Sequence, residues 1–415
     1  MKKTSFTGYE KLVIALLAVT QFTVVLDFMV MSPLGDILMK SLEINPKQFG
    51  LAVSSYAFSA GISGLLAAGF ADKYDRKKLL LFFYVGFIIG TLFCALAPNY
   101  ELLVAARIFT GLFGGVIGSI GMAIITDIFA IEQRGRVMGV VQMGFAASQV
   151  LGIPIGLYLA NLWGWHSPFL MIVGLSIIIA LAIMQGLKPV DKHLALKTER
   201  NVFEHFRHVL SSKNYQIAFA GTALLSVGGF LMMPFGSAFA INNLKITQDD
   251  LPLIYMITGI ASLVIMPIVG RLSDKFDKFK VFAFGTGWAI VMTVIYTNLP
   301  PVPLWSILII NILLFAGIMS RMIPSTSLMT AIPQMQDRGA FMSINSSLQQ
   351  IAGGIASIVA GFIIVQKDRY SPLENYPTLG VISVVIMLIC LWLVYKVNVL
   401  VKHKIGPKQT VSENA

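Results

Sequence analysis

Long apolar runs separated by short polar segments make up most of the chain. A helix needs about 20 apolar residues to cross the ~30 Å hydrocarbon core of a bilayer. The runs are continuous rather than alternating, so they predict membrane-spanning helices and not the strands of a membrane barrel. We identify twelve runs, the ninth being the shortest, at residues 12–34, 49–70, 79–97, 102–126, 137–160, 167–187, 215–240, 251–270, 281–297, 303–323, 341–365 and 378–400.

The composition agrees with an all-α membrane protein. Of the 415 residues, 56% are hydrophobic and only 12% are charged, which is about half the charged fraction of a soluble protein. Cys94 and Cys390 lie inside apolar runs, so we expect packed free thiols and no disulfide framework. The first run is long and lacks a small-residue cleavage site, so it is predicted to be a retained span and not a signal peptide.

The distribution of charge predicts the orientation. The net charge is +11, and with both termini inside, the inner segments hold 24 of the 31 Lys and Arg residues. This asymmetry follows the positive-inside rule and predicts cytoplasmic termini. We expect the membrane to be a bacterial inner membrane. The basic excess therefore faces the cytoplasmic leaflet and is not a nucleic-acid-binding surface. Only five bases fall in the outer loops: Lys40, Lys47, Lys245, Lys367 and Arg369.

The chain divides into two six-helix halves. We predict an N-terminal half at 1–187, a cytoplasmic linker at 188–214, a C-terminal half at 215–402 and a cytoplasmic tail at 403–415. The linker ends in "TERNVFEHFRHVLSSKNY", whose apolar side chains form one helical stripe. That pattern predicts an interfacial helix on the inner leaflet, and a partner-binding helix is the alternative.

Matching inner loops relate the two halves. "AGFADKYDRKK" from Ala68 aligns without gaps with "GRLSDKFDKFK" from Gly270, and "QRGRVMG" at 133 matches "DRGAFMS" at 337. Such a duplication predicts two pseudo-symmetric halves with a binding cavity at their interface near the bilayer midplane.

These motifs resemble those of the major facilitator superfamily. "DKYDRKK" resembles the loop usually written G-x-L-A-D-R-x-G-R-R, although Ala68, Phe70, Lys73 and Asp75 depart from it. "ARIFTGLFGG" in the fourth run resembles the arginine-bearing motif, and "GIPIG" at 152 resembles the antiporter motif with Ile153 inserted. "LDFMVMSPLG" and "GWHSPFL" are similar to twelve-helix drug:proton antiporters. The resemblance implies a twelve-helix fold, alternating access and proton-coupled export.

Asp27 and Arg107 are opposite charges at the same predicted depth. Asp27 lies 15 residues after Leu12, and Arg107 lies 5 residues into a run that descends from outside. Both positions are about 22 Å above the inner boundary at 1.5 Å per residue. An isolated charge there is costly, whereas a paired or hydrated one costs less. We predict a proton- or substrate-coupling site, and a static ion pair that joins two helices is the alternative.

Arg321 lies 18 residues into the tenth run. Its side chain could reach the inner headgroups or line the inner cavity and bind an anionic group. Other cavity candidates are amides, a hydroxyl and thioethers on the membrane helices, although each is more often a helix–helix contact. They are Gln21, Thr23, Met31, Gln142, Gln149, Met233, Asn345, Gln349 and Gln350.

Acids end the second and eighth runs at the inner surface. Such an acid can accept from the positive N-terminus of a neighbouring helix and pair with nearby bases. In the resembled family this loop holds the cytoplasmic side shut in the outward-open state. A solvated charge cluster is the alternative. We assign gating to Asp72, Lys73, Arg76, Asp274 and Lys275.

Small residues at four-residue spacing predict close helix packing between the halves. Pro154 is expected to add a bend. The ridges are Gly144, Ser148, Gly152 and Gly156 in the fifth run and Gly353, Ser357 and Gly361 in the eleventh.

No catalytic or nucleotide-binding motif is present, so we predict a transporter and not an enzyme. We expect a monomer that needs no metal or cofactor, moves a small molecule and protons across the lipid bilayer, and exports hydrophobic or cationic compounds (multidrug-type efflux). The alternatives are a proton symporter or facilitator for a sugar or organic anion, and a membrane-embedded protein without transport activity.

Overall fold

A computed structural model describes residues 6–67, 71–191, 194, 202–334 and 337–405, and these form a helical protein. The described secondary structure outside the helices is one isolated bridge between Val365 and Glu374. The helices are α1 Gly8–Val30, α2 Gly35–Ser41, α3 Pro46–Ala67, η1 Ala71–Lys73, α4 Arg76–Leu96, α5 Tyr100–Ile128, α6 Ile131–Ala147, η2 Ser148–Gly152, α7 Ile153–Trp163, α8 Ser167–Gly186, α9 Val202–Ser211, α10 Lys213–Phe230, η4 Met233–Phe235, α11 Gly236–Asn242, α12 Leu251–Lys275, α13 Lys278–Thr297, α14 Leu304–Thr330, α15 Arg338–Ile363 and α16 Tyr376–Ile405.

Twelve helical stretches of the described chain are long and apolar enough to cross a membrane, which confirms the predicted number. Each coincides with one predicted run, including the shortest, which is α13. Two of the stretches combine several elements: α6, η2 and α7 form the fifth, and α10, η4 and α11 form the seventh.

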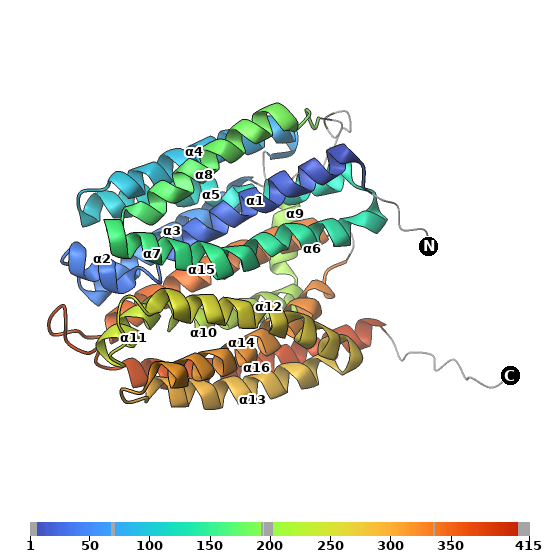
Figure 1. The fold of residues 1–415 in the computed structure, drawn as a ribbon. Coiled ribbons are helices and arrows are strands. Elements are labelled where there is room, and N and C mark those ends of the chain that lie inside the picture. The colour runs from blue at the N-terminus through green and yellow to red at the C-terminus, as the bar shows by residue number, and fades with distance from the viewer. Residues whose placement is uncertain (1–5, 68–70, 192–193, 195–201, 335–336, 406–415) are drawn as a thin grey trace.

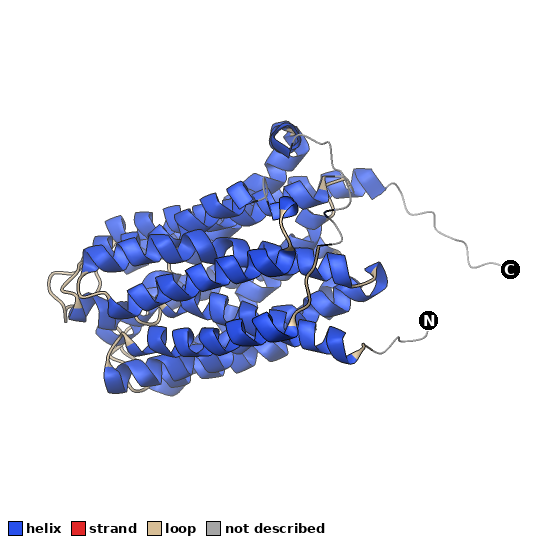
Figure 2. Cartoon of the chain, turned by 90° about the horizontal axis from the view of Figure 1, so that it is seen from above, coloured by secondary structure: helices blue, strands red, loops and turns tan. Residues whose placement is uncertain are grey.

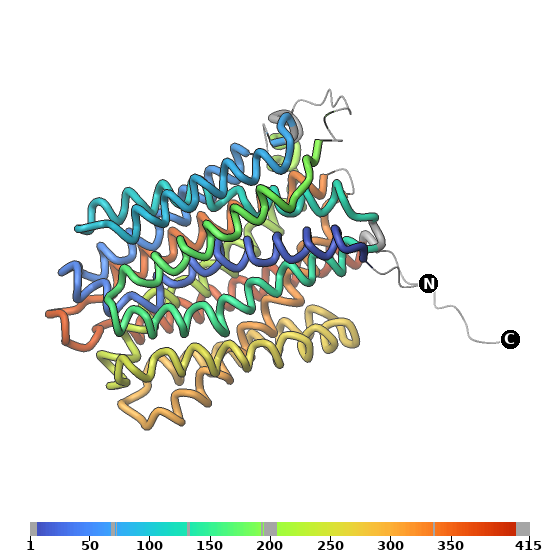
Figure 3. The backbone as a smooth tube through the Cα atoms, turned by 45° about the horizontal axis from the view of Figure 1, so that its top comes forward, coloured from blue at the N-terminus to red at the C-terminus, as the bar shows by residue number. Residues whose placement is uncertain are grey.

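The long helices lie roughly side by side in two groups, α1 to α8 and α10 to α16 (Figure 1). The start of α1 and the end of α16 lie at the same end of the bundle (Figure 3). We call this the terminal end and the opposite one the distal end. The short helices α2 and α11 both lie at the distal end (Figure 1).

Proline and glycine explain where the first and seventh spans break. The sequence "MSPLG" at 31–35 follows α1, and "MMPFG" at 232–236 follows α10. Proline removes a backbone donor and its ring clashes with the preceding turn, so a helix ends or bends there. The chain therefore restarts as α2 in one half and α11 in the other, at matching positions.

Contacts between the two groups run mainly along α3 and α15, with a second set between α12 and α7 or η2. Glycines allow the close approach: a Cβ atom at Gly50 would lie 2.6 Å from the Ser357 carbonyl oxygen, and one at Gly61 would lie 3.0 Å from the Ser347 carbonyl oxygen. Helices α6 and α12 diverge toward the terminal end (Figures 1 and 3), and few of their residues are in contact. The second set of contacts is therefore stronger toward the distal end.

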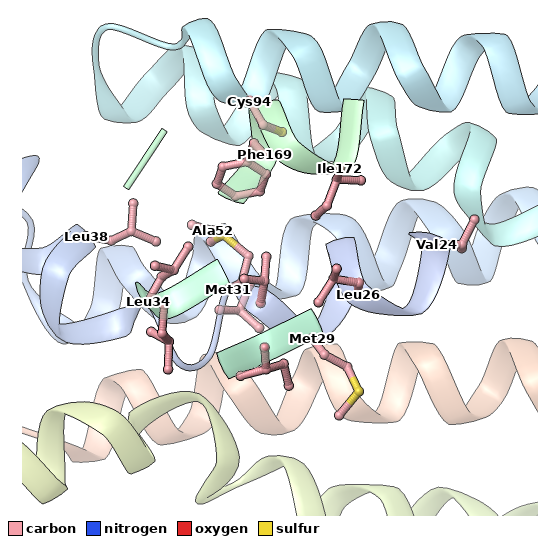
Figure 4. Close-up of a cluster of buried hydrophobic side chains, with 14 of the residues drawn as sticks. Val24, Leu26, Met29, Met31, Leu34, Leu38, Ala52, Cys94, Phe169 and Ile172 are labelled. Atoms are coloured by element: carbon pink, nitrogen blue, oxygen red, sulfur yellow. The ribbon is translucent and has the colours of Figure 1, made fainter. Parts of the chain in front are cut away.

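Apolar side chains fill the interior of each group. Figure 4 shows the part of the core around Leu26, Met31, Leu34 and Phe169, all of them fully buried. This core fixes the helices that carry the site described below.

Helix α9 lies across the ends of the long helices (Figure 1), and helices account for nearly all of the described chain (Figure 2). The predicted helix in the linker is thus present at Val202–Ser211. It packs on α10 and α15. Val209 is fully buried in the core there, whereas Leu210, which was expected on the same apolar stripe, is exposed.

Candidate buried charge site

Asp27 and Arg107 form a fully buried ion pair between α1 and α5. The Arg107 Nη1 atom lies 2.8 Å from Asp27 Oδ2 and 3.4 Å from the Asp27 carbonyl oxygen. Both residues are 0% exposed. The structure therefore brings together the two charges that helix geometry placed at equal depth.

Neighbouring helices complete the surroundings of the pair. The Thr91 hydroxyl on α4 donates to Asp27 Oδ1 at 3.2 Å. The ring of Tyr56 on α3 lies under the guanidinium, 4.5 Å from its Cζ atom to the ring centroid. Such a cation–π contact is worth about 2 kcal/mol or more when desolvated. The Nε atom of Arg107 is buried and has no hydrogen-bond partner among the residues that the structure describes.

Glycines on α5 let α3 and α4 approach the site. A Cβ atom at Gly111 would lie 2.0 Å from the Ser59 hydroxyl oxygen, and one at Gly114 would lie 2.6 Å from the Tyr56 hydroxyl oxygen. The motif "ARIFTGLFGG" thus supplies both the buried cation and the flat surface against which Tyr56 packs. Sequence reasoning missed Tyr56 and Thr91 because their helices carry no charge at this depth.

Thr23 and Met31, which were expected to line the cavity, are both 0% exposed in the described conformation. The Thr23 hydroxyl lies 2.8 Å from the Tyr84 hydroxyl and donates to the Thr20 carbonyl, so it is satisfied inside the N-terminal group of helices. Met31 belongs to the core (Figure 4).

The amide candidates keep partial or full exposure. Gln21 is half-buried, and its Oε1 atom would lie 3.9 Å from a Cβ atom at Gly118 of α5. Gln149, Met233, Asn345 and Gln350 are also half-buried, and Gln142 and Gln349 are exposed.

Arg321 is buried inside the C-terminal group of helices, so its side chain is not at the surface of the described structure. It is 3% exposed, and its Cζ atom lies 5.9 Å from the centroid of the Phe282 ring on α13. Within the described part of the chain, its Nε and Nη2 atoms have no hydrogen-bond partner. Among the described residues, no carboxylate lies within ion-pair distance of this guanidinium.

The predicted gating loops lie at the terminal end. Arg76 is buried and its Nε atom lies 3.2 Å from Asp127 Oδ2 on α5. Lys73 is exposed, and the structure does not describe the side chain of Asp72. In the second loop, Lys275 is exposed and the Lys278 Nζ atom lies 3.8 Å from Asp274 Oδ1.

A stronger contact in the second loop joins it to the end of α16. The Lys402 Nζ atom lies 2.8 Å from Asp277 Oδ2, and the backbone N–H of Lys280 donates to Asp277 Oδ1 at 3.1 Å. Partial burial by itself raises the pKa of Asp277, but these bonds outweigh burial and the pKa lies below its usual value.

The small-residue ridges divide between two roles, which corrects the expectation that both join the halves. A Cβ atom at Gly144 would lie 2.5 Å from the Ala18 carbonyl oxygen, and one at Gly152 would lie 2.6 Å from Leu26, so this ridge packs on α1 of its own half. Ser148 is buried in the π-helical turn η2, Gly156 faces Val30 and Pro168, and Pro154 lies in the first turn of α7, which begins at Ile153.

The ridge on α15 does cross between the halves. A Cβ atom at Gly361 would lie 2.8 Å from the Pro46 carbonyl oxygen of α3, and the Ser357 carbonyl oxygen faces Gly50. Gly353 instead faces Phe230 in its own half. The glycines of α3 that complete this seam were not singled out from the sequence.

A family comparison decides what this helical architecture is. The sequence matches the model of the Major Facilitator Superfamily over residues 17–357 and again over residues 218–412. The chain belongs to the major facilitator superfamily.

Relatives of this facilitator include transporters of two descriptions. An "Uncharacterized MFS-type transporter YceJ" of Bacillus subtilis (strain 168) is 24% identical over 360 residues, which cover 86% of this chain and 90% of that protein. A "Probable sugar efflux transporter" of Helicobacter pylori (strain G27) is 26% identical over 258 residues, covering 62% of this chain and 64% of that protein. The chain is accordingly a multi-pass membrane transporter of the superfamily.

Solved structures show the same fold. A bacterial homolog to the human lysosomal transporter Spinster, in an inward-facing and unoccupied conformation, superposes with a TM-score of 0.75 at 15% identity and covers 95% of this chain and 98% of that one. The nucleoside transporter NupG gives a TM-score of 0.72 at 16% identity, covering 93% of this chain and 99% of that one.

Proposed function

We propose that this facilitator exports small hydrophobic or cationic compounds in exchange for protons, as in multidrug-type efflux, by alternating access in a bacterial inner membrane. The observation that carries the proposal is the Asp27–Arg107 pair, which lies fully buried at 2.8 Å. An ion pair at this depth responds to a single proton, because protonating the carboxylate removes the charge that balances Arg107.

The pair couples a proton to helix movement in three steps. Ionised Asp27 attracts Arg107 and thereby holds α1 against α5. Protonated Asp27 loses that attraction, and Arg107 retains its cation–π contact with the ring of Tyr56. The helices can then shift, and the opened space admits water that takes the proton away on the other side of the membrane.

The arrangement of the halves supports this cycle. The contacts that join them through η2, α7 and α12 are strongest toward the distal end, and α6 and α12 diverge toward the terminal end. With the termini in the cytoplasm, as the charge distribution predicts, the described conformation is closed to the outside. This is the state in which an exporter loads its cargo.

A second candidate cargo is a sugar or a similar hydroxylated solute. The incompletely buried amides Gln21, Gln142, Gln149, Asn345 and Gln349 favour it, because amides both donate and accept hydrogen bonds. The described pair leaves Asp27 no free charge for a cationic cargo until Arg107 is displaced. The sugar efflux description of one relative agrees with this candidate.

We further propose that the proton gradient is the only energy source, that no metal or cofactor takes part, and that the monomer is sufficient. Within the described residues, no cluster of His, Cys, Asp and Glu could hold a metal ion.

The test uses inverted membrane vesicles with an acidic interior and an internal pH-sensitive dye. Lipophilic cations, neutral drugs and sugars are added in turn to vesicles with the native protein, Asp27→Asn or Glu101→Gln. Glu101 is a matched control because it is an exposed carboxylate at the start of α5. We expect cargo-driven proton release in the native and control vesicles and none in Asp27→Asn.

The class of compound that triggers release decides between the two cargoes. Release by sugars alone replaces the drug assignment with the second candidate. Equal release by native protein and Asp27→Asn refutes the coupling role of the pair and leaves it as a static tie between helices. A response to none of the compounds contradicts proton exchange and favours an importer.

A further inference from the structure

A set of polar contacts joins the two halves at the distal end, away from the charge pair. It is centred on α2 and α11, the short helices that follow the matching sequences "MSPLG" and "MMPFG". The Ser32 hydroxyl donates to the Met233 carbonyl, and the Ser237 hydroxyl donates to the Ser32 carbonyl at 2.9 Å. Each broken helix thus bonds to the backbone or side chain of the other.

Asp36 and Asn242 form the innermost of these contacts. The Asn242 Nδ2 atom donates to Asp36 Oδ1 at 2.7 Å and to the Ala238 carbonyl at 3.0 Å. Lys40, one turn later on α2, donates to Asp36 Oδ2 at 2.8 Å. Asp36 is 1% exposed and Asn242 is 3% exposed. Both carboxylate oxygens are therefore satisfied, one from each half.

Because it is buried, the Asp36–Asn242 hydrogen bond is stronger than the exposed polar contacts near it. The Arg369–Glu43 pair also crosses between the halves at the distal end, at 2.8 Å, but its side chains are 46% and 67% exposed. Exposed pairs contribute little because water and salt screen them. A hydrogen bond to a buried charge is stronger, and leaving its partner unpaired is costly.

We propose that the Asp36–Asn242 bond is the latch that keeps the distal end closed, with Lys40 neutralising the carboxylate. The two residues are positioning residues for the conformational cycle and rest on the proposed alternating-access function. Opening the distal end breaks the bond, so its strength sets the balance between the two states. Aromatic packing of Phe49 against Phe235, at 5.7 Å between ring centroids, closes the same region.

The test measures distances by double electron–electron resonance in the full chain in nanodiscs. One pair of spin labels replaces Ser41 and Lys245, which are exposed on either side of the latch. A second pair replaces Arg136 on α6 and Lys275 on α12 at the terminal end. The native cysteines, Cys94 and Cys390, are buried and are replaced by alanine.

Asn242→Asp places a second carboxylate against Asp36, and we expect it to lower the closed-to-open ratio at the distal end about tenfold or more. The terminal pair should move closer in the same samples. The exchange Asp36→Asn with Asn242→Asp restores one carboxylate and one amide, so it should recover at least part of the closed population. Glu43→Gln, the exposed control, should leave both distances unchanged.

Distances unchanged in Asn242→Asp, or no recovery in the exchanged variant, overturn the latch. Broadening at both ends overturns it as well, because that result means loss of packing and not a shift between states. The measurement uses neither cargo nor a pH gradient. Its result therefore stands apart from the vesicle experiment, and either proposal can fail alone.

Discussion

Arg107 bonds to Asp27 through Nη1 at 2.8 Å, while its own Nε atom is buried and has no hydrogen-bond partner in the described structure. The site thus holds a charge that is balanced but not fully hydrogen-bonded. In a buried network the loss of one partner costs more than the loss of both. Because of this asymmetry, the interaction energy between Asp27 and Arg107 can be measured by comparing single and double substitutions.

Asp27→Asn alone should destabilise the protein by about 3–5 kcal/mol, because it leaves the Arg107 cation buried without a counter-ion. Removing both charges, with Asp27→Leu and Arg107→Met, should recover most of that loss. Thermal unfolding in detergent, followed by tryptophan fluorescence, measures both variants. The single variants Asp27→Leu and Arg107→Met are measured in the same way, and losses that simply add in the double variant contradict the pairing.

The aromatic face under Arg107 should matter through its ring and not its hydroxyl. Tyr56→Phe keeps the ring 4.5 Å from the guanidinium, so we expect near-native stability. Tyr56→Leu should cost about 2 kcal/mol or more beyond the change in packing, because the desolvated cation–π contact is lost. The comparison uses the same unfolding assay, and equal losses in the two variants refute the contact.

A single methyl group in the seam between α3 and α15 should impair transport. Gly50→Ala places a Cβ atom 2.6 Å from the Ser357 carbonyl oxygen, and overpacking of this kind costs about 1–3 kcal/mol. We expect the transport rate in vesicles to fall while the protein still inserts and folds. Gly174→Ala on α8 is the control, since no atom lies within 4 Å of its Cβ position.

Acid should release the end of α16 from the loop between α12 and α13. The pKa of Asp277 is lowered in the folded protein. The ionised carboxylate therefore stabilises the contact with α16 in full at pH values above its unfolded pKa of about 4. The contribution is lost as the pH falls through the lower, folded value.

Hydrogen exchange of the terminal turns of α16, measured across this range at matched intrinsic rates, checks the prediction. Faster exchange at low pH should occur in the native protein and be absent in Asp277→Asn, in which the turns exchange at the faster level throughout. A pH dependence that persists in the variant assigns the effect to other groups.

Replacing the buried Arg321 by methionine should raise the unfolding temperature. Among the described residues, this 3% exposed guanidinium has no carboxylate partner and two of its nitrogen atoms have no hydrogen bond. A charge without a counter-ion in a membrane helix costs several kcal/mol. Methionine fills similar volume without that cost. Arg271→Met, at an exposed position on α12, should change little. A lower unfolding temperature in Arg321→Met means that the cation has a stabilising partner.

The sequence was sufficient for the spans and for the depth of the two charges. Hydropathy identifies spans because lipid permits few polar residues, and a constant rise per residue converts position into depth. The sequence alone could not show which helices face one another. Gly144 therefore looked like a contact between halves although it packs on α1, and Tyr56 had no distinguishing signal.

The distal latch escaped prediction for a related reason. Asp36 lies four residues before Lys40, so it resembled one of the solvated charges at the end of a span. Its partner Asn242 is 206 positions away in the chain. The matching "MSPLG" and "MMPFG" sequences, which were not singled out from the sequence, are the signal that the two segments occupy equivalent places.

Among the described residues no carboxylate pairs with Arg321, and this has a consequence for the response to voltage. Arg107 is matched by Asp27, so this pair adds no net charge to the N-terminal half, whereas Arg321 adds one positive charge to the interior of the other. An electric field across the membrane exerts no net force on the first and a net force on the second. The work is about 2.3 kcal/mol per elementary charge for a full crossing at 100 mV. Any movement of Arg321 along the field makes the balance between the two conformations depend on membrane potential, even when no proton moves.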